Sequence, residues 1–246
     1  MDEEVPVHGQ VAKRTISLTA SWAFFAFSII INSMGNVLTL VTSSHIHPQF
    51  LGSAYWTAAE NNLGIAILGN RPTTLFWAFM ILGMLTSVLN AILMHKWDWR
   101  RIGGNFIFML PFSLFIQWFS NIFNRIMPAA TTLPMVILYV LINFLGVAFI
   151  GTAISIYQRA NLVLHPADDL FQIIRFRYCH GNATIAMWAS YIPPTIMAII
   201  AAIIQGGIYN FGLGTLFALA FQCAITGWAD LHIFPHLKHQ ALDVGN

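Results

Sequence analysis

The chain has 246 residues, of which 57% are hydrophobic and 8% are charged, and its formal net charge is +2. Soluble domains carry roughly 25% charged residues, so a soluble fold of this length would lack the charges needed to cover its surface. A lipid bilayer accepts an apolar exterior. The composition therefore predicts an all-α, polytopic membrane protein in contact with lipid, and no nucleic-acid partner is expected.

Six apolar runs approach or exceed the roughly 20 residues that a helix needs to cross a bilayer. In chain order they are 16–42, 73–94, 102–123, 133–157, 184–207 and 211–234. Pro193 and Pro194 predict a break or kink in the fifth run. The chain starts with the acidic residues Asp2, Glu3 and Glu4, whereas a secretory signal peptide starts with a basic region. We therefore expect about six transmembrane helices, the first of which stays in the mature protein.

Lysine and arginine residues gather on one side of this predicted topology. If successive helices cross in alternate directions, nine of them, including Lys13, lie on the side of the N-terminus, and Arg71 and Arg125 lie on the other. Cytoplasmic loops carry the excess of Lys and Arg in membrane proteins. The distribution predicts a multi-pass protein of the bacterial cytoplasmic (cell) membrane with both termini in the cytoplasm.

Two parts of the chain repeat one order of elements, in which a His-Pro pair follows a long apolar run and a glycine comes further on. The residues of the two copies are His47, Pro48 and Gly64, and His165, Pro166 and Gly181. Residues 1–246 are thus expected to form a single membrane domain of two repeats, about 18–124 and about 133–234. With three spanning helices each, the repeats would enter the membrane from opposite sides, as the inverted repeats of secondary transporters do.

Each repeat also holds a short segment, 49–62 or 167–180, that is too polar and too short to cross a bilayer. Pro48 and Pro166 suit the first turn of a helix there, because proline has no N–H group to leave unsatisfied. Each segment is expected to be either an interfacial helix or a re-entrant helix that enters the bilayer and returns. A re-entrant form needs cover from protein or a wet cavity, and would therefore imply a central site.

The second repeat contains short motifs that resemble those of a known family. They are Gly151-Thr152-Ala153, Asn161-Leu162 leading to Pro166-Ala167-Asp168, and Gly212-Leu213-Gly214-Thr215. With the order of elements in both repeats, these motifs make the chain similar to the YczE/YyaS/YitT-like family of bacterial integral membrane proteins. The first repeat departs from the pattern, because no acid follows Pro48 and residues 101–104 keep only part of the glycine motif. The resemblance implies a bacterial membrane protein of a family that is often regarded as transporters, and it names no substrate.

Ionisable groups in the middle of a membrane helix cost about 2.5–3.5 kcal/mol each on insertion scales, so they are candidates for function. In this sequence they lie in or beside the short segments and helix ends. We expect a polar cavity between the repeats that binds the substrate. Its expected lining residues are Asp168, Gln172, Arg175 and His165 from the second repeat, and Glu60, Asn61, Asn62, Tyr55, Trp56 and His47 from the first.

Some of these residues also suit a purely structural role, and the sequence leaves both roles open. Asp168 is placed to stabilise a helix N-terminus, where carboxylates are favoured. Arg175 suits a cytoplasmic anchor beside the membrane. His47 and His165 form a repeated pair, with either a proton-binding role or a role in the loops.

No metal site, cofactor or enzymatic activity is predicted. The histidines near helix ends form two groups, His45 with His47 and His232 with His236 and His239. These groups lie on opposite sides of the predicted membrane and cannot share one ion. Cys179 and Cys223 form no metal or redox motif, and the chain has no P-loop or nucleophile elbow.

The predicted function is that of a transporter or permease-like protein, which moves a small solute or ion through the cavity between the repeats. One alternative is a substrate-binding membrane subunit of an ATPase-driven importer. A regulatory or assembly membrane protein is another, and a His-metal membrane enzyme is the last. An ATPase partner and a homo-oligomer are both compatible with the sequence.

Overall fold

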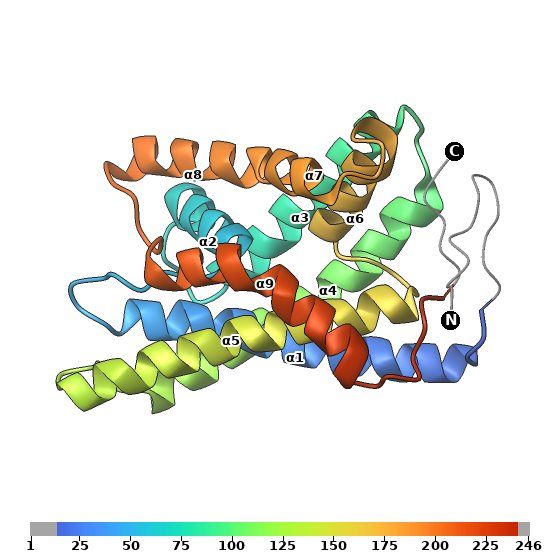
Figure 1. Ribbon diagram of the computed structural model, residues 1–246. Helices are drawn as coiled ribbons and strands as arrows, with labels where there is room; N and C mark the ends of the chain where they lie inside the picture. Colours follow the sequence, from blue (N-terminus) through green and yellow to red (C-terminus); the bar gives the residue numbers. More distant parts are fainter. Residues whose placement is uncertain (1–13, 241–246) are drawn as a thin grey trace.

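The computed structural model describes residues 14–240, and this part of the chain forms helices and loops without a strand (Figure 1). The helices are α1 (Leu18–Ser44), α2 (Tyr55–Leu68), α3 (Thr74–Met94), α4 (Trp99–Ile126), α5 (Leu133–Ala160), α6 (Pro166–Ile173), α7 (Ala183–Ser190), α8 (Ile192–Gln205) and α9 (Leu213–His232). A π-helical turn, Ile174–Tyr178, extends α6. The acidic start of the chain and Lys13, both used to predict the topology, lie outside the described residues.

Five helical segments are long and apolar enough to cross a bilayer. They are α1, α3, α4, α5 and Thr184–Gln205, which joins α7 and α8. The all-helical fold predicted from the sequence is confirmed, and these helices indicate a membrane protein. The sixth predicted run, 211–234, forms α9, which is not among the five. The count of six crossings stays a prediction.

The fifth predicted run is interrupted where its prolines occur. Helix α7 ends at Ser190, and Pro193 and Pro194 lie in the first turn of α8. Proline has no N–H group to donate and its ring clashes with the preceding turn, so a continuous helix is broken here. The predicted break is therefore observed.

Helices α1 and α5 lie side by side, and the other helices are arranged around this pair (Figure 1). Helix α4 packs against α1 and α3, whereas α9 packs against α5. The short helix α2 packs against α3 and α8, and the short helix α6 packs against α3 and α7. Each short helix is thus covered by longer helices from two directions.

Glycines allow α1 and α5 to approach closely. A Cβ atom on Gly35 would lie 2.6 Å from the carbonyl oxygen of Gly146, and one on Gly146 would lie 2.7 Å from that of Gly35. Separations this short are repulsive, so neither position has room for a side chain. Small residues at helix interfaces provide the close packing that holds helices together in lipid.

Helix α2 begins inside the molecule. The loop after α1 turns back into the bundle, where Ser53 is fully buried. The backbone N–H of Ser53 donates to Asn210 O (3.0 Å) and that of Leu213 donates to Phe50 O (2.9 Å), so the loop is fixed to the start of α9. From there α2 runs outward to the exposed turn that contains Arg71. Helix α2 therefore has its first residues inside the bundle and its end at an exposed turn.

Helix α6 also begins inside the bundle. Amide side chains from the neighbouring helices bind the backbone that leads into it: Asn105 Nδ2 donates to Leu164 O and Asn90 Nδ2 donates to Pro166 O, both at 2.9 Å. Pro166 occupies the first turn of α6, as predicted. The corresponding prediction for Pro48 was wrong, because this residue lies in the loop before α2, which the chain needs in order to turn inward.

Replacing Gly146 by alanine should destabilise the protein by about 1–3 kcal/mol, because the added methyl group overpacks the α1–α5 interface. Its Cβ would lie 3.0 Å from Thr39 Cγ2 as well as against the backbone of Gly35. The control is Gly227→Ala on α9, where a Cβ meets no atom within 4 Å. Alanine is a better helix former than glycine, so this control should keep or raise the melting temperature in detergent. An equal loss in both variants would contradict the proposed packing.

Candidate functional site

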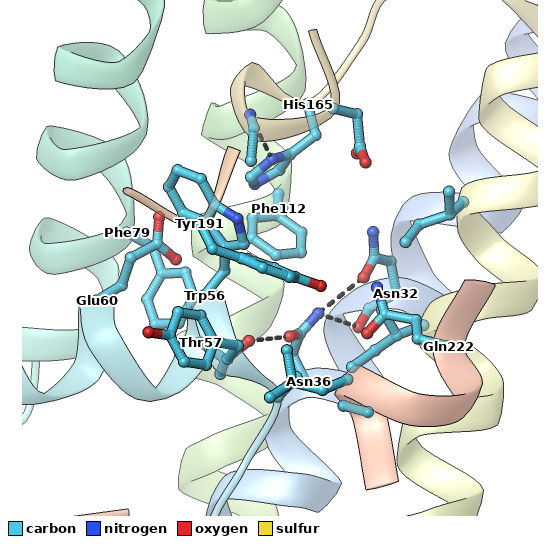
Figure 2. Close-up of a pocket in the computed structure, with 18 of the residues that line it drawn as sticks. Asn32, Asn36, Trp56, Thr57, Glu60, Phe79, Phe112, His165, Tyr191 and Gln222 are labelled. Atoms are coloured by element: carbon cyan, nitrogen blue, oxygen red, sulfur yellow. Dashed lines mark hydrogen bonds between the residues drawn. The ribbon is translucent and has the colours of Figure 1, made fainter. Parts of the chain in front are cut away.

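A cavity of about 80 Å³ lies among the helices where α2 and α6 begin (Figure 2). Two acids, three amides and a set of aromatic rings form most of its wall. These residues are Glu60, Asp168, Asn32, Asn36, Gln222, Tyr55, Trp56, Phe79, Phe112, Tyr157 and Tyr191. The two short helices, which are far apart in sequence, thus meet at one polar cavity.

Hydrogen bonds join α1 to the first turn of α2 at one side of this cavity (Figure 2). Asn36 Nδ2 donates to Asn32 O (2.9 Å) and to Asn32 Oδ1 (2.7 Å). The hydroxyl of Thr57 donates to Asn36 Oδ1. The two asparagines lie one turn apart on α1 and therefore present their side chains on the same face. These bonds fix the position at which α2 starts.

Asp168 faces the cavity from the first turn of α6. The hydroxyl of Tyr157 donates to its carboxylate. Burial raises the pKa of Asp168 above its usual range, the hydrogen bond from Tyr157 lowers it, and the charge of Asp169 adds to the rise. The cap of α6 is His165, whose Nδ1 accepts a hydrogen bond from the backbone N–H of Ala167 (3.1 Å). Of the two roles open to Asp168, the structure therefore favours the one in the cavity.

Glu60 lines the cavity from the second turn of α2 and is 2% exposed. Within the described part of the chain, its Oε1 atom has no hydrogen-bond partner. Burial raises the pKa of Glu60, because desolvation disfavours the charged form of the carboxyl group. Buried polar groups in native proteins are nearly always paired, so an unpartnered carboxyl beside a cavity points to a ligand or a proton as its partner.

His165 is buried and edge-on to two aromatic rings, those of Phe108 and Phe112, whose centroids lie 5.2 Å from its own. Burial lowers the pKa of His165, so its imidazole is neutral at physiological pH. Because Nδ1 accepts the bond from Ala167, the ring proton lies on Nε2. His165 therefore positions α6, and its surroundings do not support a proton-binding role.

Asp169 has a different role from its neighbour Asp168. It is 1% exposed and forms an ion pair with Arg101 of α4, which donates from both Nε and Nη2. Asn90 of α3 also donates to its carboxylate (3.3 Å). Asp169 thus holds α6 against α3 and α4, while Asp168 is left facing the cavity.

A second cavity, of about 480 Å³, adjoins the first on the side where α1 begins. Trp56, Asp168 and Tyr191 belong to the walls of both cavities, so the two cavities adjoin each other. Arg175 and Asp230 line the outer part of it. We call this space the N-side vestibule.

A third cavity, of about 670 Å³, lies on the opposite side, near the end of α2, and shares no lining residue with the central cavity. We call it the far-side vestibule. Asn62 and its partners lie between the two. Asn62 Nδ2 donates to Tyr209 O (2.5 Å) and Gln205 Nε2 donates to Asn62 O (2.6 Å). These bonds tie α2 to the end of α8 and to the loop before α9, on the side where the central cavity and the far-side vestibule are separate.

The residues predicted from the sequence divide among these three cavities. Those at the central cavity are Glu60, Asp168, His165, Tyr55 and Trp56. Arg175 lines the N-side vestibule, and Asn61 and Asn62 line the far-side vestibule. Gln172 and His47 line none of the three. His47 is exposed, because the loop after α1 turns inward only beyond it.

Several residues of the central cavity were missed because they lie within long apolar helices. They are Asn32, Asn36, Tyr157 and Gln222. One signal was available in the sequence, since Asn32 and Asn36 are spaced one helical turn apart in an otherwise apolar run. Tyr157 and Gln222 carry no such spacing, and only the packing of α5 and α9 places them at the cavity.

The chemistry of the central cavity suits reversible binding. Its carboxyl, amide, hydroxyl and aromatic groups offer hydrogen bonds and apolar contact to a small molecule. In the described part of the chain, no group of three or more His, Cys, Asp or Glu side chains is arranged to hold a metal ion. Cys179 and Cys223 are both free thiols.

These features define a class, namely an all-helical membrane protein in which two short helices start at a shared polar cavity. The chain belongs to a family described as a family of unknown function, DUF6198, whose model matches residues 19–230. No curated protein and no solved structure gives a significant match. The resemblance to the YczE/YyaS/YitT-like family stays a prediction.

The neighbouring acids of α6 should respond differently to the same substitution. Asp169→Asn removes the charge that pairs with Arg101 and should cost about 1–3 kcal/mol, less than for a fully buried pair, because the arginine side chain is 23% exposed. Asp168→Asn should cost less than about 1 kcal/mol, since burial already disfavours its charged form. Melting temperatures of the two variants in detergent measure the difference. A larger loss for Asp168→Asn would contradict the assigned roles.

Proposed function

We propose that the protein is a carrier that moves a small solute across the bacterial cytoplasmic membrane through the central cavity. The observation that carries this proposal is the convergence of two short helices, α2 and α6, on a cavity with a buried carboxyl group whose Oε1 atom has no partner among the described residues. Broken helices that meet near the middle of a membrane protein form the substrate sites of many secondary transporters. Glu60 and Asp168 are the acids that the two helices bring to this cavity.

The packing of the helices supports an inverted repeat of α1–α4 and α5–α9. In such a repeat α5 corresponds to α1, α6 to α2, α7 with α8 to α3, and α9 to α4. The contact of α1 with α4 then corresponds to that of α5 with α9, and the contact of α2 with α8 to that of α6 with α3. The contact of α3 with α4 has no comparable counterpart between α8 and α9, so the correspondence covers part of the packing. On this proposal α9 is the sixth crossing.

The excess of Lys and Arg on the side where α1 begins supports a cytoplasmic location of that side. The N-side vestibule then faces the cytoplasm, and the structure has the form of an inward-open carrier. On the far side, the bonds of Asn62 to Tyr209 and Gln205 join α2 to the loop before α9 and to the end of α8. Transport requires a second state in which α2 separates from the loop between α8 and α9 and the N-side vestibule closes.

Alternating access predicts that one position in the central cavity can be reached from both sides of the membrane. Ala218 lines that cavity and is 4% exposed, so Ala218→Cys introduces a thiol there with little change in volume. The background is the variant with both native cysteines, Cys179 and Cys223, replaced by serine. A membrane-impermeant thiol reagent is applied to vesicles of either orientation. Ala218→Cys should be labelled from both sides, and faster from the N side.

Two matched variants define the sidedness of this assay. Gln158→Cys in the N-side vestibule should be labelled from the N side alone, and Ser44→Cys in the far-side vestibule from the far side alone. Labelling of Ala218→Cys from one side alone, with both controls as expected, would rule out alternating access. That result would favour a regulatory or assembly protein.

A further inference from the structure

The wall of the central cavity contains two acidic side chains and no lysine or arginine of the described residues. Its acids are Glu60 and Asp168. His165 adds no charge, because burial lowers its pKa. Asp169, the third acid nearby, is already paired with Arg101 outside the cavity. The side chains of this cavity therefore favour a positively charged ligand.

The N-termini of α2 and α6 also lie at the cavity, and their partial positive charge disfavours a positively charged ligand. A helix N-terminus is equivalent to roughly +0.5 elementary charge. That of α6 is capped by His165, and that of α2 has no side-chain cap. The two N-termini together amount to roughly +1 elementary charge against two carboxylates. The balance is negative when both carboxyls are ionised.

Aromatic rings make up much of the remaining wall. They are Tyr55, Trp56, Phe79, Phe112, Tyr157 and Tyr191. The negative face of an aromatic ring attracts a cation, and the attraction grows when water is excluded. Neutral solutes and anions gain nothing comparable from the same rings. The aromatic rings and the two acids of the wall therefore both favour a positively charged ligand.

The central cavity, of about 80 Å³, is small beside the adjoining N-side vestibule of about 480 Å³, so a small charged group suits it. A simple amine or a guanidinium group meets this description. The vestibule is wide enough for such a molecule to approach the cavity.

We infer that the central cavity binds a small organic cation of the size of methylammonium or guanidinium, held between Glu60, Asp168 and the aromatic wall. This inference deepens the proposed function and rests on it for the step from binding to transport. The cation supplies the partner that Glu60 Oε1 lacks.

Guanidinium and urea provide a direct test, because they have nearly the same planar shape and differ by one charge. The full-length protein is purified in detergent, and its melting temperature is measured with guanidinium chloride, with urea and with sodium chloride, all at the same low concentration. A ligand that binds the folded state raises the melting temperature by mass action. Guanidinium and methylammonium chloride should raise it, whereas urea and sodium chloride should not. An equal shift with urea, or no shift with either cation, would overturn the inference.

Variants test whether the effect arises in the central cavity. Glu60→Gln and Asp168→Asn should each weaken the apparent affinity for guanidinium about tenfold or more, since each removes a charged hydrogen-bond acceptor. Their melting temperatures without ligand show whether they are folded. The control is Asp98→Asn, which keeps a capping residue at the start of α4 outside the cavity and should leave the affinity unchanged. Unchanged affinity in both folded cavity variants would overturn the inference.

The pH dependence of binding gives an independent readout. Burial raises the pKa of Glu60 to about 8 and that of Asp168 to about 6, so Asp168 gains its charge between weakly acidic and neutral pH and Glu60 gains its charge in weakly alkaline solution. The other titratable groups at the cavity are Tyr55, Tyr157, Tyr191 and His165, whereas α1, α3, α4 and α9 present amide and apolar side chains. The affinity for guanidinium, which keeps its charge throughout, should therefore rise as the pH changes from weakly acidic to weakly alkaline. An affinity independent of pH would contradict the inference.

The inference and the proposed function can fail separately. Labelling of Ala218→Cys from both sides without any effect of guanidinium would leave the carrier and remove the cation as its substrate. Stabilisation by guanidinium with labelling from one side alone would support the cation site and rule out alternating access. The first result would contradict only the cation site, and the second would contradict only the carrier function.

Discussion

Every break in a membrane helix leaves backbone N–H and C=O groups that lipid cannot satisfy, and this constraint shapes the whole structure. Two helices, α2 and α6, start inside the bundle, so the chain leading into each of them must find partners within the protein. Asparagine side chains on the surrounding elements supply these partners. Asn143 binds Gly52 O, Asn105 binds Leu164 O, and Asn90 binds Pro166 O. The cavity exists because these bonds allow two helices to begin beside one another at depth.

The two neighbouring acids of α6 have different roles: Asp169 forms an ion pair within the protein, whereas Asp168 faces the cavity. Asp169 is fully engaged by Arg101 and Asn90, which fixes the angle at which α6 leaves the cavity. Asp168, one residue earlier, then points in a different direction because adjacent residues on a helix lie about 100° apart. Helix α2 contains no basic residue that could perform the corresponding task for Glu60. The protein therefore keeps two carboxyl groups at one cavity and pairs its nearby arginine with a neighbouring acid.

Composition and the lengths of the apolar runs were sufficient to predict an all-helical membrane protein and the approximate position of each long helix. The two short helices were also recognised, since a polar segment between apolar runs that is too short to cross a bilayer must lie at the interface or turn back. Their starting points were harder to predict. Pro166 lies in the first turn of its helix, whereas Pro48 lies in the loop before α2. The difference depends on the length of loop that each chain segment needs to reach the inside of the bundle. The roles of Asp168 and Asp169 could not be divided from sequence, because the division depends on the distant Arg101.

The arrangement of contacts indicates where the two states of a carrier would differ. Helix α2 is tied to the loop before α9 and to the end of α8 through Asn62, on the far side of the central cavity. On the N side, the π-helical turn after α6 reaches α3 through Tyr178, whose hydroxyl donates to Leu93 O (2.5 Å), yet the vestibule beside it is open. If the two halves are inverted copies, each half can adopt the conformation now seen in the other, so that far-side bonds break as N-side contacts tighten. Helices α1 and α5 are held together by the close approach of Gly35 and Gly146 and by the bonds of Asn143 to Thr39 O and Thr42 Oγ1, so this pair would stay together in such a motion.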